Sequence, residues 1–523
     1  MIPEWTGQIP GVLSNMTSDQ RSRHVCSLTY HEITQDPRVF KQALALRKRG
    51  YRVTVLCIAS PDRPNIEEIE GIEVRRFDAY GPDGASYEAL AEVDYMDASR
   101  TSVMERLGPY LDLAAQYQSV ATELNDVGIG ASKLQQLEEG KQAYKSQRGP
   151  MRLVAKLAYQ LEVSKTLRAA RSTGLERPEL HKALLRRRGL QRELREAKRR
   201  LDQANGYLFA MNLVPAVADL RPDLVHAHDI YCLPGGVAFA KRTGAKLLYD
   251  AHEYEPARVI RMREVADDFA GMIELDCLRF VDRMTTVSRT FKDLYAKRFV
   301  GPTPYLIYNS PPQASKDEDE LPNIRTLTDI DASTPLLVFT GGVQRENRGL
   351  DKVLEAMSYL PSDVALTIMG PRNERNDAWL LAAAAKHRMQ ERLRLVPSVP
   401  ADKVVRTISA ANVAIVATQD ISLNQRFSMP NKLFEAAFAG VPLVVSDLPD
   451  MGSFVKELGI GTVMDPTDPR SIAEAIRLVL ENPEDFKADD QAQARLHNEY
   501  SWPVQENTLA TIVEDLVELD RTN

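Results

Sequence analysis

Residues 428–447 read SMPNKLFEAAFAGVPLVVSD, and this stretch decides the fold. It predicts a turn with Pro430 near the start of an amphipathic helix, which Gly440 ends, and then Pro442 and a β-branched strand. A helix that begins in this way offers free backbone N–H groups and the positive end of its dipole to a diphosphate. Glu435, in the second helical turn, can accept hydrogen bonds from ribose hydroxyls. These residues indicate a nucleotide-diphosphate site, although an ordinary strand–helix unit has a similar pattern.

The length and composition indicate a globular protein of two domains. The chain has 523 residues, of which 44% are hydrophobic and 27% charged, and its formal net charge of −7 argues against a general nucleic-acid binder. Residues 1–15 lack a signal-peptide pattern and no run approaches about 18 apolar residues, so we expect a cytoplasmic protein. The four cysteines lack zinc or redox spacing and are interpreted as buried free thiols: Cys26, Cys57, Cys232 and Cys277.

Two runs of alternating strands and helices predict two doubly wound α/β domains with parallel sheets. The first run predicts strands at His24–Tyr30, Arg52–Ala59, Ile72–Phe77, Asp223–His228, Ala245–Asp250, Met284–Ser288 and Tyr305–Asn309, and helices at Val39–Arg49, Leu233–Arg242 and Arg258–Val281. A polar linker at Gln313–Asp331 follows. The second run predicts strands at Leu336–Thr340, Ala365–Gly370, Leu393–Pro397, Val413–Ala417 and Leu443–Ser446, and then helices at Ser471–Asn482 and Ser501–Asp520.

A helical insertion interrupts the first domain at about residues 80–215. It has little strand character and predicts helices at Arg106–Asn125, Ser132–Ser146, Met151–Arg171 and Glu179–Leu213. The segment Arg186–Arg200 is basic and is offset by only Glu193 and Glu196. Three interpretations are open: a solvated helix face, contact with anionic lipid headgroups or an anionic acceptor, and helix self-association. Leucines in this segment form either a membrane-facing stripe or a buried one: Leu184, Leu185, Leu190, Leu194 and Leu201.

The order of residues from Ser428 to Glu435 resembles the donor-binding segment of family 4 glycosyltransferases, in the variant form S-x-P-N-K-x-x-E. The resemblance covers Val25–Phe77 and about Asp223–Glu514, and it does not cover the insertion. It implies the GT-B fold, in which two Rossmann-like doubly wound domains face a cleft, here with a helical insertion in the N-terminal domain. The expected parts are an N-terminal acceptor-side domain (1–312), a linker (313–334), a C-terminal nucleotide-sugar-binding domain (335–500) and a helix that crosses back to the N-terminal domain (501–523).

In the second domain, the resemblance implies a loop that binds the diphosphate of the donor. Gly341 and Gly342 let the backbone approach a phosphate closely. Arg348 takes the role of the cation that neutralises the leaving diphosphate, on which negative charge develops during transfer. Val343 stands where many family members have an arginine, so Arg345 is the candidate for a second positive charge.

The helix segment and a neighbouring strand end supply the other donor-binding candidates. Glu435 matches the second glutamate of the family's E-x7-E motif, whereas Phe427 occupies the place of the first. Because the first glutamate is missing, we expect the backbone N–H groups after Ser428, together with Asn431, to hold the sugar hydroxyls instead. Gly370 and Lys432 complete this set. The alternative interpretation of Lys432 is an ordinary lysine on the surface of the helix.

In the first domain, residues 221–229 read RPDLVHAHD and resemble the family strand whose second histidine contacts the donor sugar. The resemblance therefore implies catalytic roles for His228, Arg348 and Glu435. His252 and Glu253 follow the next strand, and Glu253 is the candidate for acceptor binding or proton acceptance. Near the N-terminus, Asp36 and Arg38 are expected to face the acceptor or the diphosphate, with a helix cap as the alternative.

The resemblance implies a retaining glycosyltransferase that uses no divalent metal and no cofactor. The sequence has no Asp-x-Asp motif after a strand, where a metal-dependent transferase needs it. The expected partners are a nucleotide-diphosphate sugar, by this resemblance a UDP-sugar, and a hydroxyl acceptor that is a glycan or lipid-linked glycan. An anionic membrane surface on the inner face of the membrane is a further expected partner, and nucleic acid is not. Three alternatives stay open: a nucleotide-sugar 2-epimerase, a hydrolase on the same fold, and a non-catalytic partner protein.

Overall fold

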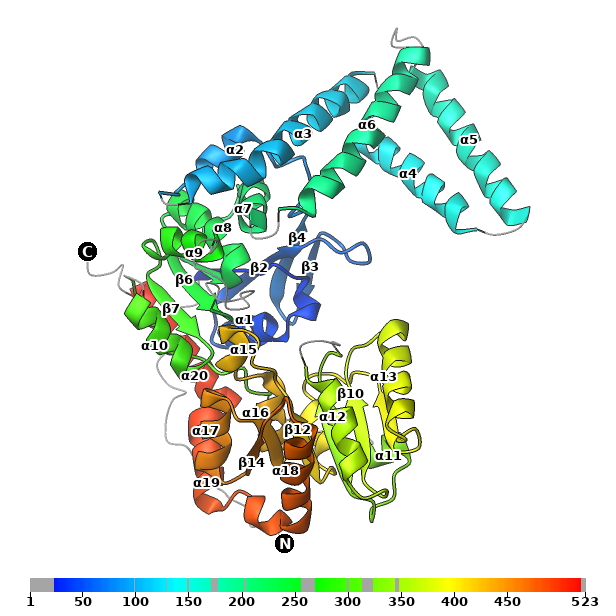
Figure 1. Ribbon diagram of the computed structural model, residues 1–523. Helices are drawn as coiled ribbons and strands as arrows, with labels where there is room; N and C mark the ends of the chain where they lie inside the picture. Colours follow the sequence, from blue (N-terminus) through cyan, green and yellow to red (C-terminus); the bar gives the residue numbers. More distant parts are fainter. Residues whose placement is uncertain are drawn as a thin grey trace. The chain divides into compact units, whose positions relative to one another are not determined.

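The computed structural model describes residues 23–518 except 98, 128, 148–149, 171–176, 202–203, 255–268, 299–300, 313–322 and 344–347. The chain divides into two compact units, which are described separately here. One unit joins Met1–Arg76 to Arg221–Asn523, and the other is Phe77–Leu220. A single helical segment therefore interrupts an α/β unit that contains two sheets (Figure 1).

The first sheet has eight strands among the described residues, in the order β3-β4-β2-β1-β5-β6-β7-β8. Parallel pairs join β2, β1, β5, β6, β7 and β8, whereas β3 and β4 form an antiparallel pair at one edge. The strands with continuous apolar runs are buried, as expected for a parallel sheet covered on both faces. Their bounds are β1 His24–Leu28, β2 Arg52–Ile58, β3 Ile66–Ile69, β4 Ile72–Phe77, β5 Leu224–His228, β6 Lys246–Ala251, β7 Arg283–Thr286 and β8 Tyr305–Leu306.

The helices of the first sheet follow its strands, except for one that comes from the end of the chain. They are α1 Pro37–Lys48, α8 Asp229–Thr243, α9 Phe269–Leu278, α10 Arg289–Arg298 and α20 Trp502–Glu518. The terminal helix α20 packs against α1 and β5. Its Leu509 and Val513 join a buried core with Val25 of β1 and Val39 of α1. Burial of this apolar face fixes the chain end on the first domain.

The second sheet has six strands within the described ranges, in the order β11-β10-β9-β12-β13-β14, and all of its pairs are parallel. Successive residues of β9 join different cores, because Leu336 and Val338 pack on one face and Leu337 and Phe339 on the other. The strands are β9 Leu336–Thr340, β10 Ala365–Met369, β11 Leu393–Val396, β12 Val413–Val416, β13 Leu443–Ser446 and β14 Gly461–Met464. The helices are α11 Ile324–Thr328, α12 Leu350–Ala356, α13 Glu374–Lys386, α14 Val404–Ile408, α15 Leu423–Arg426, α16 Asn431–Phe438, α17 Pro449–Leu458, α18 Pro469–Glu481 and α19 Asp490–Arg495.

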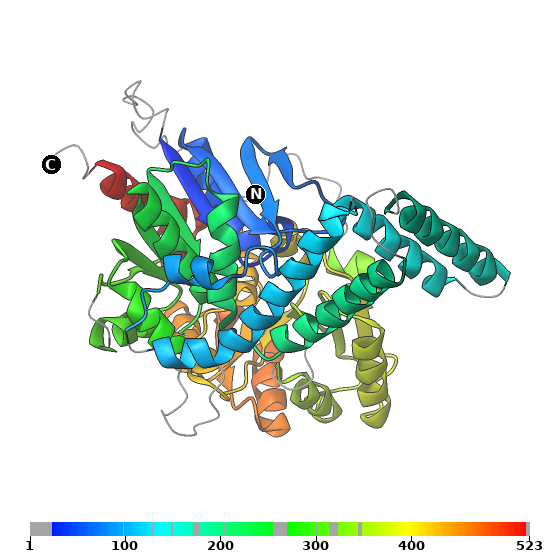
Figure 2. The same ribbon diagram turned by 90° about the horizontal axis from the view of Figure 1, so that it is seen from above.

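The unit Phe77–Leu220 is helical in its described residues. Its helices are α2 Tyr87–Glu92, α3 Arg100–Asp126, α4 Ala131–Ser146, α5 Pro150–Ala170, α6 Arg177–Lys198 and α7 Asn205–Ala216. The long helices pack in pairs, α3 with α6 and α4 with α5 (Figure 2). None of the described helices in the whole chain is both long and apolar enough to cross a membrane.

Several predicted elements differ from the structure. The single helix predicted at Glu179–Leu213 is two helices, α6 and α7, with a break before Asn205. The short strands β3 and β14 were not predicted, because each has only four residues and little apolar alternation. The part of the predicted helix Arg258–Val281 that is described ends at Leu278, and residues 258–268 lie outside the described ranges.

The predicted leucine stripe of the basic segment is a buried face, so it does not form a membrane-facing surface. Leu184, Leu190, Leu194 and Leu201 are all buried, and only Leu185 is exposed. Leu184, Leu190 and Leu194 belong to α6, which packs on α3, and Leu201 follows its end; burial removes their apolar surface from water. The basic residues of α6 therefore lie on a helix whose apolar side is already occupied.

Candidate active site

Two glycine loops meet where β9 and β10 end. Gly341 has φ +106° and Gly370 has φ +154°, conformations that favour glycine. A Cβ atom on Gly370 would lie 2.2 Å from the carbonyl oxygen of Gly341, so the two backbones touch. The N–H of Gly341 also donates to the carbonyl of Met369 at 2.9 Å. Gly342 is less constrained, because an added Cβ would meet nothing nearer than 3.9 Å.

Helix α16 begins at the same edge of the second sheet. Pro430 is its N-cap residue, and no side chain caps the helix. The first-turn N–H groups are consequently left to other partners, which suits an anion. Ser428 is turned to its own loop, where its Oγ donates to the carbonyl of Gln425 at 3.0 Å.

Three ionisable side chains near the start of α16 are buried or half-buried: Lys432, Glu435 and Arg348. Lys432 is only 7% exposed, so the alternative of a surface lysine is wrong, and its Nζ lies 4.1 Å from the centre of the Phe339 ring. Burial and the nearby Arg348 lower the pKa of Lys432 to about 7 against the opposing effect of Glu435. Burial raises the pKa of Glu435 to about 7, although Lys41, a hydrogen bond from Thr340 and Lys432 favour its charged form.

Arg348 is the third charged group of this cluster. Burial lowers the pKa of its guanidinium, and the charge of Glu253 acts in the opposite direction. Gly349, next to it, has φ +63°, and a Cβ there would lie 2.5 Å from the carbonyl of Ala417. The chain after Arg348 is therefore held against β12 by backbone contact. Arg345 lies outside the described residues.

Lys41 of α1 was not predicted as a site residue. Its Nζ donates to Asn309 Oδ1 at 2.9 Å and lies 4.4 Å from the centre of the Trp502 ring. Burial and the charge of Arg38 lower the pKa of Lys41 to about 7, and Glu435 opposes this shift. A lysine inside a helix has no sequence signal that marks it as part of a site, so only the structure could reveal it.

A pocket of about 600 Å³ lies where the strands of both sheets end. It brings together seven predicted site residues: Asp36, Arg38, His252, Glu253, Arg348, Ser428 and Asn431. Among the described residues, its lining does not include His228, Lys432, Glu435 or the three predicted glycines. Asn424 was not predicted and joins the two sides, because it accepts from the N–H of Tyr254 at 2.7 Å and donates to Glu253 Oε2 at 3.3 Å.

Asp250 is the centre of a buried polar network on the first sheet. It accepts from Arg38 Nε and Nη2 at 2.9 and 2.7 Å, from Gln42 at 2.9 Å and from Thr285 at 2.7 Å. His252 Nε2 lies 3.2 Å from Asp250 Oδ2. Burial by itself would raise the pKa of Asp250, but Arg38, the histidines and these hydrogen bonds hold it well below its usual range. The carboxylate is therefore charged and fully engaged.

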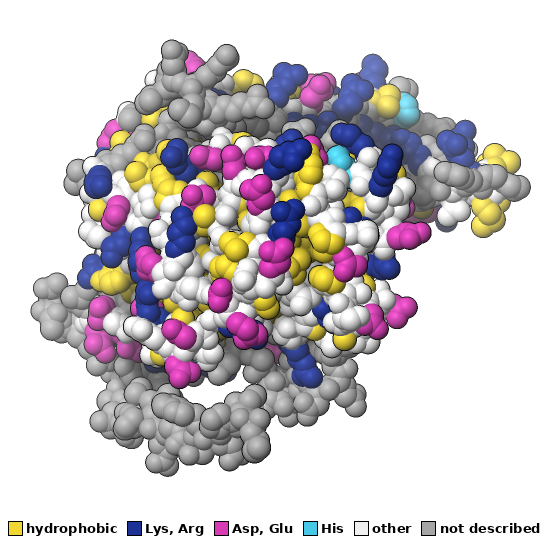
Figure 3. Space-filling model, turned by 60° about the horizontal axis from the view of Figure 1, so that its bottom comes forward, with side chains coloured by type: hydrophobic (Ala, Val, Ile, Leu, Met, Phe, Trp, Pro, Cys, Tyr) yellow, Lys and Arg dark blue, Asp and Glu magenta, His cyan; other side chains and the backbone are white. Residues whose placement is uncertain are grey.

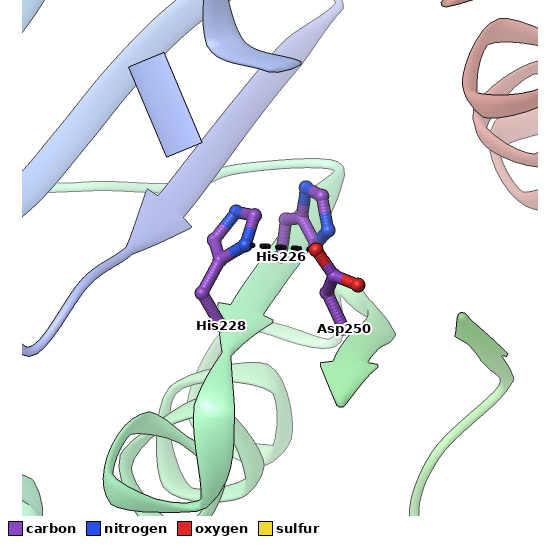
Figure 4. Close-up of side chains that lie close together, drawn as sticks. All are labelled: His226, His228 and Asp250. Carbon is purple, nitrogen blue, oxygen red and sulfur yellow. Dashed lines mark ion pairs between the residues drawn. The ribbon is translucent and has the colours of Figure 1, made fainter. Parts of the chain in front are cut away.

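His226 and His228 point from β5 toward Asp250 of β6 (Figure 4). Their ring centres are 4.0 Å apart, and His228 Nδ1 lies 3.3 Å from Asp250 Oδ2. Burial lowers the pKa of His228, although Asp250 opposes the shift. Possible ligand atoms of the three residues lie within 4.8 Å of one another, which is a spacing that could hold a metal ion. The hydrogen bonds from Arg38, Gln42 and Thr285 already occupy the carboxylate, and the adjacent guanidinium opposes a second cation. Both ring nitrogens of His226 are buried without a hydrogen-bond partner among the described residues.

The predicted residues near the N-terminus have structural partners. Asp36 is the N-cap of α1, because its Oδ1 accepts from the N–H of Val39 at 3.2 Å. Arg38 is 4% exposed and is committed to Asp250. Both residues line the pocket, so the prediction that they face a ligand stays open. The helix-cap alternative describes Asp36 correctly, whereas the Arg38 side chain forms a buried ion pair instead of a cap. Sequence order gave no signal for this pair, which is separated by more than two hundred residues.

This arrangement defines a GT-B fold: two Rossmann-like parallel sheets, with a pocket at the carboxyl ends of their strands. The chain carries two glycosyltransferase domains by family comparison. Residues 323–496 match the family described as glycosyl transferases group 1, and residues 147–309 match the glycosyl transferase 4-like domain. The predicted fold class is confirmed, and the family 4 resemblance is confirmed for these two segments, whereas the subgroup with the S-x-P-N-K-x-x-E segment stays a prediction. The extent predicted for the resemblance is wrong in part, because one match begins at residue 147 within the insertion and neither match includes Val25–Phe77.

Curated relatives and solved structures agree with this assignment. A glycogen synthase of Mycobacterium tuberculosis is 25% identical over 290 residues, which are 54% of this chain and 66% of that protein. A D-inositol 3-phosphate glycosyltransferase of Xylanimonas cellulosilytica is 26% identical over 187 residues, 35% of this chain and 42% of that protein. The chain thus spans less than two thirds of the length of these relatives. A sucrose-phosphate synthase structure from Thermosynechococcus elongatus has a TM-score of 0.59 at 14% identity and covers 95% of this chain and 100% of its own, which supports the fold.

Proposed function

We propose that the protein is a retaining, metal-independent glycosyltransferase. It moves a sugar from a nucleotide-diphosphate sugar, most simply a UDP-sugar, to a hydroxyl of a glycan or lipid-linked glycan. The observation that carries this proposal is the pair of cations Lys432 and Arg348. No described residue forms an ion pair with either, although burial lowers the pKa of both. Glu435 favours the charged form of Lys432 and Glu253 that of Arg348, but neither carboxylate forms an ion pair with them. A buried cation without a directly paired anion costs free energy, and a bound diphosphate would supply that anion.

The same cations suit the chemistry of transfer. When the bond between the anomeric carbon and the phosphate oxygen breaks, negative charge develops on the leaving diphosphate. In this proposal Arg348 of the pocket, the buried Lys432 and the uncapped start of α16 stabilise that charge without a divalent ion. Glu435, five residues into α16, is proposed to accept hydrogen bonds from the ribose hydroxyls.

Retention is taken in this proposal from the family resemblance, and the state of the nearby carboxylates bears only on how it is achieved. Asp36 caps α1, Asp250 is paired with Arg38, and Glu253 accepts from Asn424. None of these three is a free nucleophile positioned for a covalent intermediate. We infer that the acceptor hydroxyl attacks the face from which the diphosphate leaves. The acceptor's proton then passes to a phosphate oxygen of the leaving group, so that charge and atoms balance.

The acceptor side is proposed to lie along the first sheet. His252 and Glu253 line the pocket, and the Asp250 network fixes the position of His252. His228 is 1% exposed, so a direct contact with the donor sugar stays a prediction. The names of the relatives, a glycogen synthase and an inositol phosphate glycosyltransferase, support sugar transfer to a hydroxyl. Cytoplasmic placement and contact with the inner face of a membrane also stay predictions.

A panel of nucleotide sugars tests the proposal. Thermal unfolding with each compound identifies the donor, because a ligand at 100 times its Kd adds about 2.7 kcal/mol of stability. Mass spectrometry of products with glycan acceptors then identifies transfer. We expect one donor to stabilise the protein and to yield a glycosylated acceptor. Free sugar or an epimerised donor without acceptor product would support the epimerase or hydrolase alternative, and no binding at all would support a non-catalytic partner protein.

A further inference from the structure

Helix α5 of the helical unit exposes an apolar face. Its side chains Leu153, Leu157 and Leu161 are 62%, 53% and 59% exposed, and because they are four residues apart they form one stripe along the helix. Val154, which is 60% exposed, widens the stripe. Elsewhere among the described residues, exposed large hydrophobic side chains are mostly scattered along the sequence, which is usual for a protein surface. A cluster such as that on α5 instead marks a surface that contacts another apolar surface.

The packing of α5 within its unit uses the other side of the helix. Tyr159 accepts a hydrogen bond from Arg188 Nη2 of α6 at 2.6 Å, and Glu162 forms an ion pair with Lys133 of α4. Tyr159 and Glu162 lie about 200° and 140° around the helix from Leu157, at about 100° per residue. The contact of α5 with α4 therefore leaves the leucine stripe uncovered by the described residues.

The segment that carries the stripe is strongly basic. Residues 131–200 contain 19 lysines and arginines and 7 aspartates and glutamates, a net charge of +12 in a chain whose net charge is −7. Lys156 and Lys165 are exposed and lie on opposite sides of the stripe. Glu162, the one acidic residue in the sequence of α5, pairs with Lys133 and Lys165. Over most of the face shown in Figure 3, by contrast, basic and acidic side chains are interspersed. The stripe is thus an apolar surface with a basic border.

An apolar stripe with a basic border restricts the kind of partner. Nucleic acids and free polyanions attract lysines and arginines, but they offer no aliphatic surface to cover leucines. A second copy of the chain would bring together two segments that each have a net charge of +12. An anionic lipid bilayer meets both requirements, because its acyl chains receive apolar side chains and its headgroups attract basic ones. None of the described helices is long and apolar enough to cross a membrane, so α5 would lie along the surface.

We propose that α5 docks the protein on an anionic lipid bilayer. Leu153, Leu157 and Leu161 enter the boundary between headgroups and acyl chains, and Lys156 and Lys165 lie among the headgroups. The membrane contact expected from the sequence thereby moves from the leucines of α6, which are mostly buried, to those of α5. The docking goes beyond sugar transfer and is measured without donor or acceptor, so its failure would leave the proposed function untouched.

Flotation of the full-length protein with vesicles of phosphatidylcholine and phosphatidylglycerol tests this inference. The test variant replaces the three leucines of the stripe: L153Q/L157Q/L161Q. The matched control replaces three exposed leucines on helices of the α/β unit: L275Q/L381Q/L478Q. We expect wild type and control to partition within about twofold of each other and the test variant at least roughly tenfold more weakly, because it lacks the apolar part of the attraction. Binding should also fall in high salt and on pure phosphatidylcholine.

A fluorescent label separates insertion from electrostatic adsorption. The four native cysteines are buried, so one added surface cysteine takes the label selectively. Leu157→Cys places an environment-sensitive dye in the stripe, and Leu381→Cys places it on an exposed position of α13 as the control. On anionic vesicles the emission of the dye at position 157 should shift to the blue and be quenched by lipids with a spin label in the acyl chain. The dye at position 381 should show neither response.

Three results would overturn the inference. One is an absence of binding to anionic vesicles at low salt, and another is equal binding of the test and control variants. The third is a dimer in analytical ultracentrifugation that the test variant loses, which would assign the stripe to a second copy of the chain. If circular dichroism shows that the triple variant is unfolded, L157Q/L161Q replaces it, with L381Q/L478Q as its control.

Discussion

Buried charges lie beside both sheets of the α/β unit, but they have very different partners. On the first sheet, Asp250 receives two hydrogen bonds from Arg38 and one each from Gln42 and Thr285. On the second sheet, Lys432 is buried against the Phe339 ring, and no described residue forms an ion pair with it. The Asp250 carboxylate therefore has its partners within the protein, whereas Lys432 has no ion-pair partner among the described residues.

This difference indicates that the two sets of charged residues have different roles, one in positioning side chains and the other in binding a ligand. A satisfied network holds its members in one geometry and contributes little attraction for a ligand. Cations that lack a counter-ion raise the free energy of the empty site and lower it when an anion arrives. We infer that the first sheet supplies a rigid wall of the pocket and that the second sheet supplies most of the binding energy for the diphosphate.

The largest expected effect is the loss of the Asp250 network. Asp250→Ala leaves the Arg38 guanidinium buried without its partner, which should lower the free energy of unfolding by about 3–5 kcal/mol. Denaturant unfolding measures this change. Asp447→Ala is the control, because its pair with Lys456 is 59% exposed on the aspartate side, and such pairs contribute less than about 1 kcal/mol. Equal small losses for both variants would show that Asp250 is not a structural centre.

Replacing the leaving-group cation should affect turnover and spare the fold. Arg348→Ala should lower kcat/KM on the order of 100-fold, because the developing charge on the diphosphate loses a partner. Arg426→Ala is a matched control, since Arg426 is 50% exposed and pairs with Asp420. Steady-state kinetics with the donor found in the screen measure kcat/KM of both variants and of the wild type. A change of less than about threefold in the Arg348 variant would refute its assignment to the diphosphate.

Replacing Lys432 should stabilise the ligand-free protein, whereas replacing Asp250 should destabilise it. Its folded-state pKa is lowered to about 7, so the free energy cost of burying it is complete below pH 7 and disappears as the pH rises toward 10.5. Lys432→Met should therefore stabilise the ligand-free protein at pH 7 by on the order of 1 kcal/mol, and this gain should shrink at higher pH. Unfolding at several pH values, with the exposed Lys456→Met as control, measures the difference. A destabilised variant at pH 7 would mean that Lys432 already has a partner in the free protein.

The smallest expected effect is that of metal removal. If side-chain cations and the start of α16 stabilise the diphosphate, EDTA should change turnover by less than about twofold. Assays with EDTA, and then with added magnesium or manganese, provide the comparison. Complete loss in EDTA that either metal restores would contradict metal-independent transfer and would direct attention to the His226, His228 and Asp250 group.

The sequence predicted the sheets better than it predicted the pairing of charges. The strands β4, β9 and β13 have the predicted bounds, because each is a short apolar or alternating run between turn residues. The helix break before Asn205 was missed, since residues on both sides of it favour helix. Ion pairs such as Arg38 with Asp250 join distant segments, and local sequence patterns contain no information about them.

The candidate site shows the same division. Arg348, Ser428 and Asn431 were selected by motif order and all line one pocket, and their roles in donor binding stay predictions. The contribution of Asn424 depends on how the first and second sheets come together, because it bonds Tyr254 and Glu253. That of Lys41 depends on the packing of α1 beside Asn309 and Trp502, and neither residue belongs to a motif. The burial of Lys432 likewise follows from the packing of α16 on Phe339 of β9, which the helix pattern alone left undecided.

Calorimetric titration of the full-length protein with UDP and UMP, in EDTA, is the most direct test of the incomplete charge set on the second sheet. We predict that UDP binds at least about tenfold more tightly than UMP, a difference of roughly 1.4 kcal/mol that comes from the second phosphate. Most of this preference should vanish in Lys432→Met and Arg348→Ala, whereas Glu435→Ala should weaken both nucleotides alike through the lost ribose contacts. Equal affinities for UDP and UMP in the wild type, or an unchanged preference in both cation variants, would contradict a diphosphate site at this edge of the sheet.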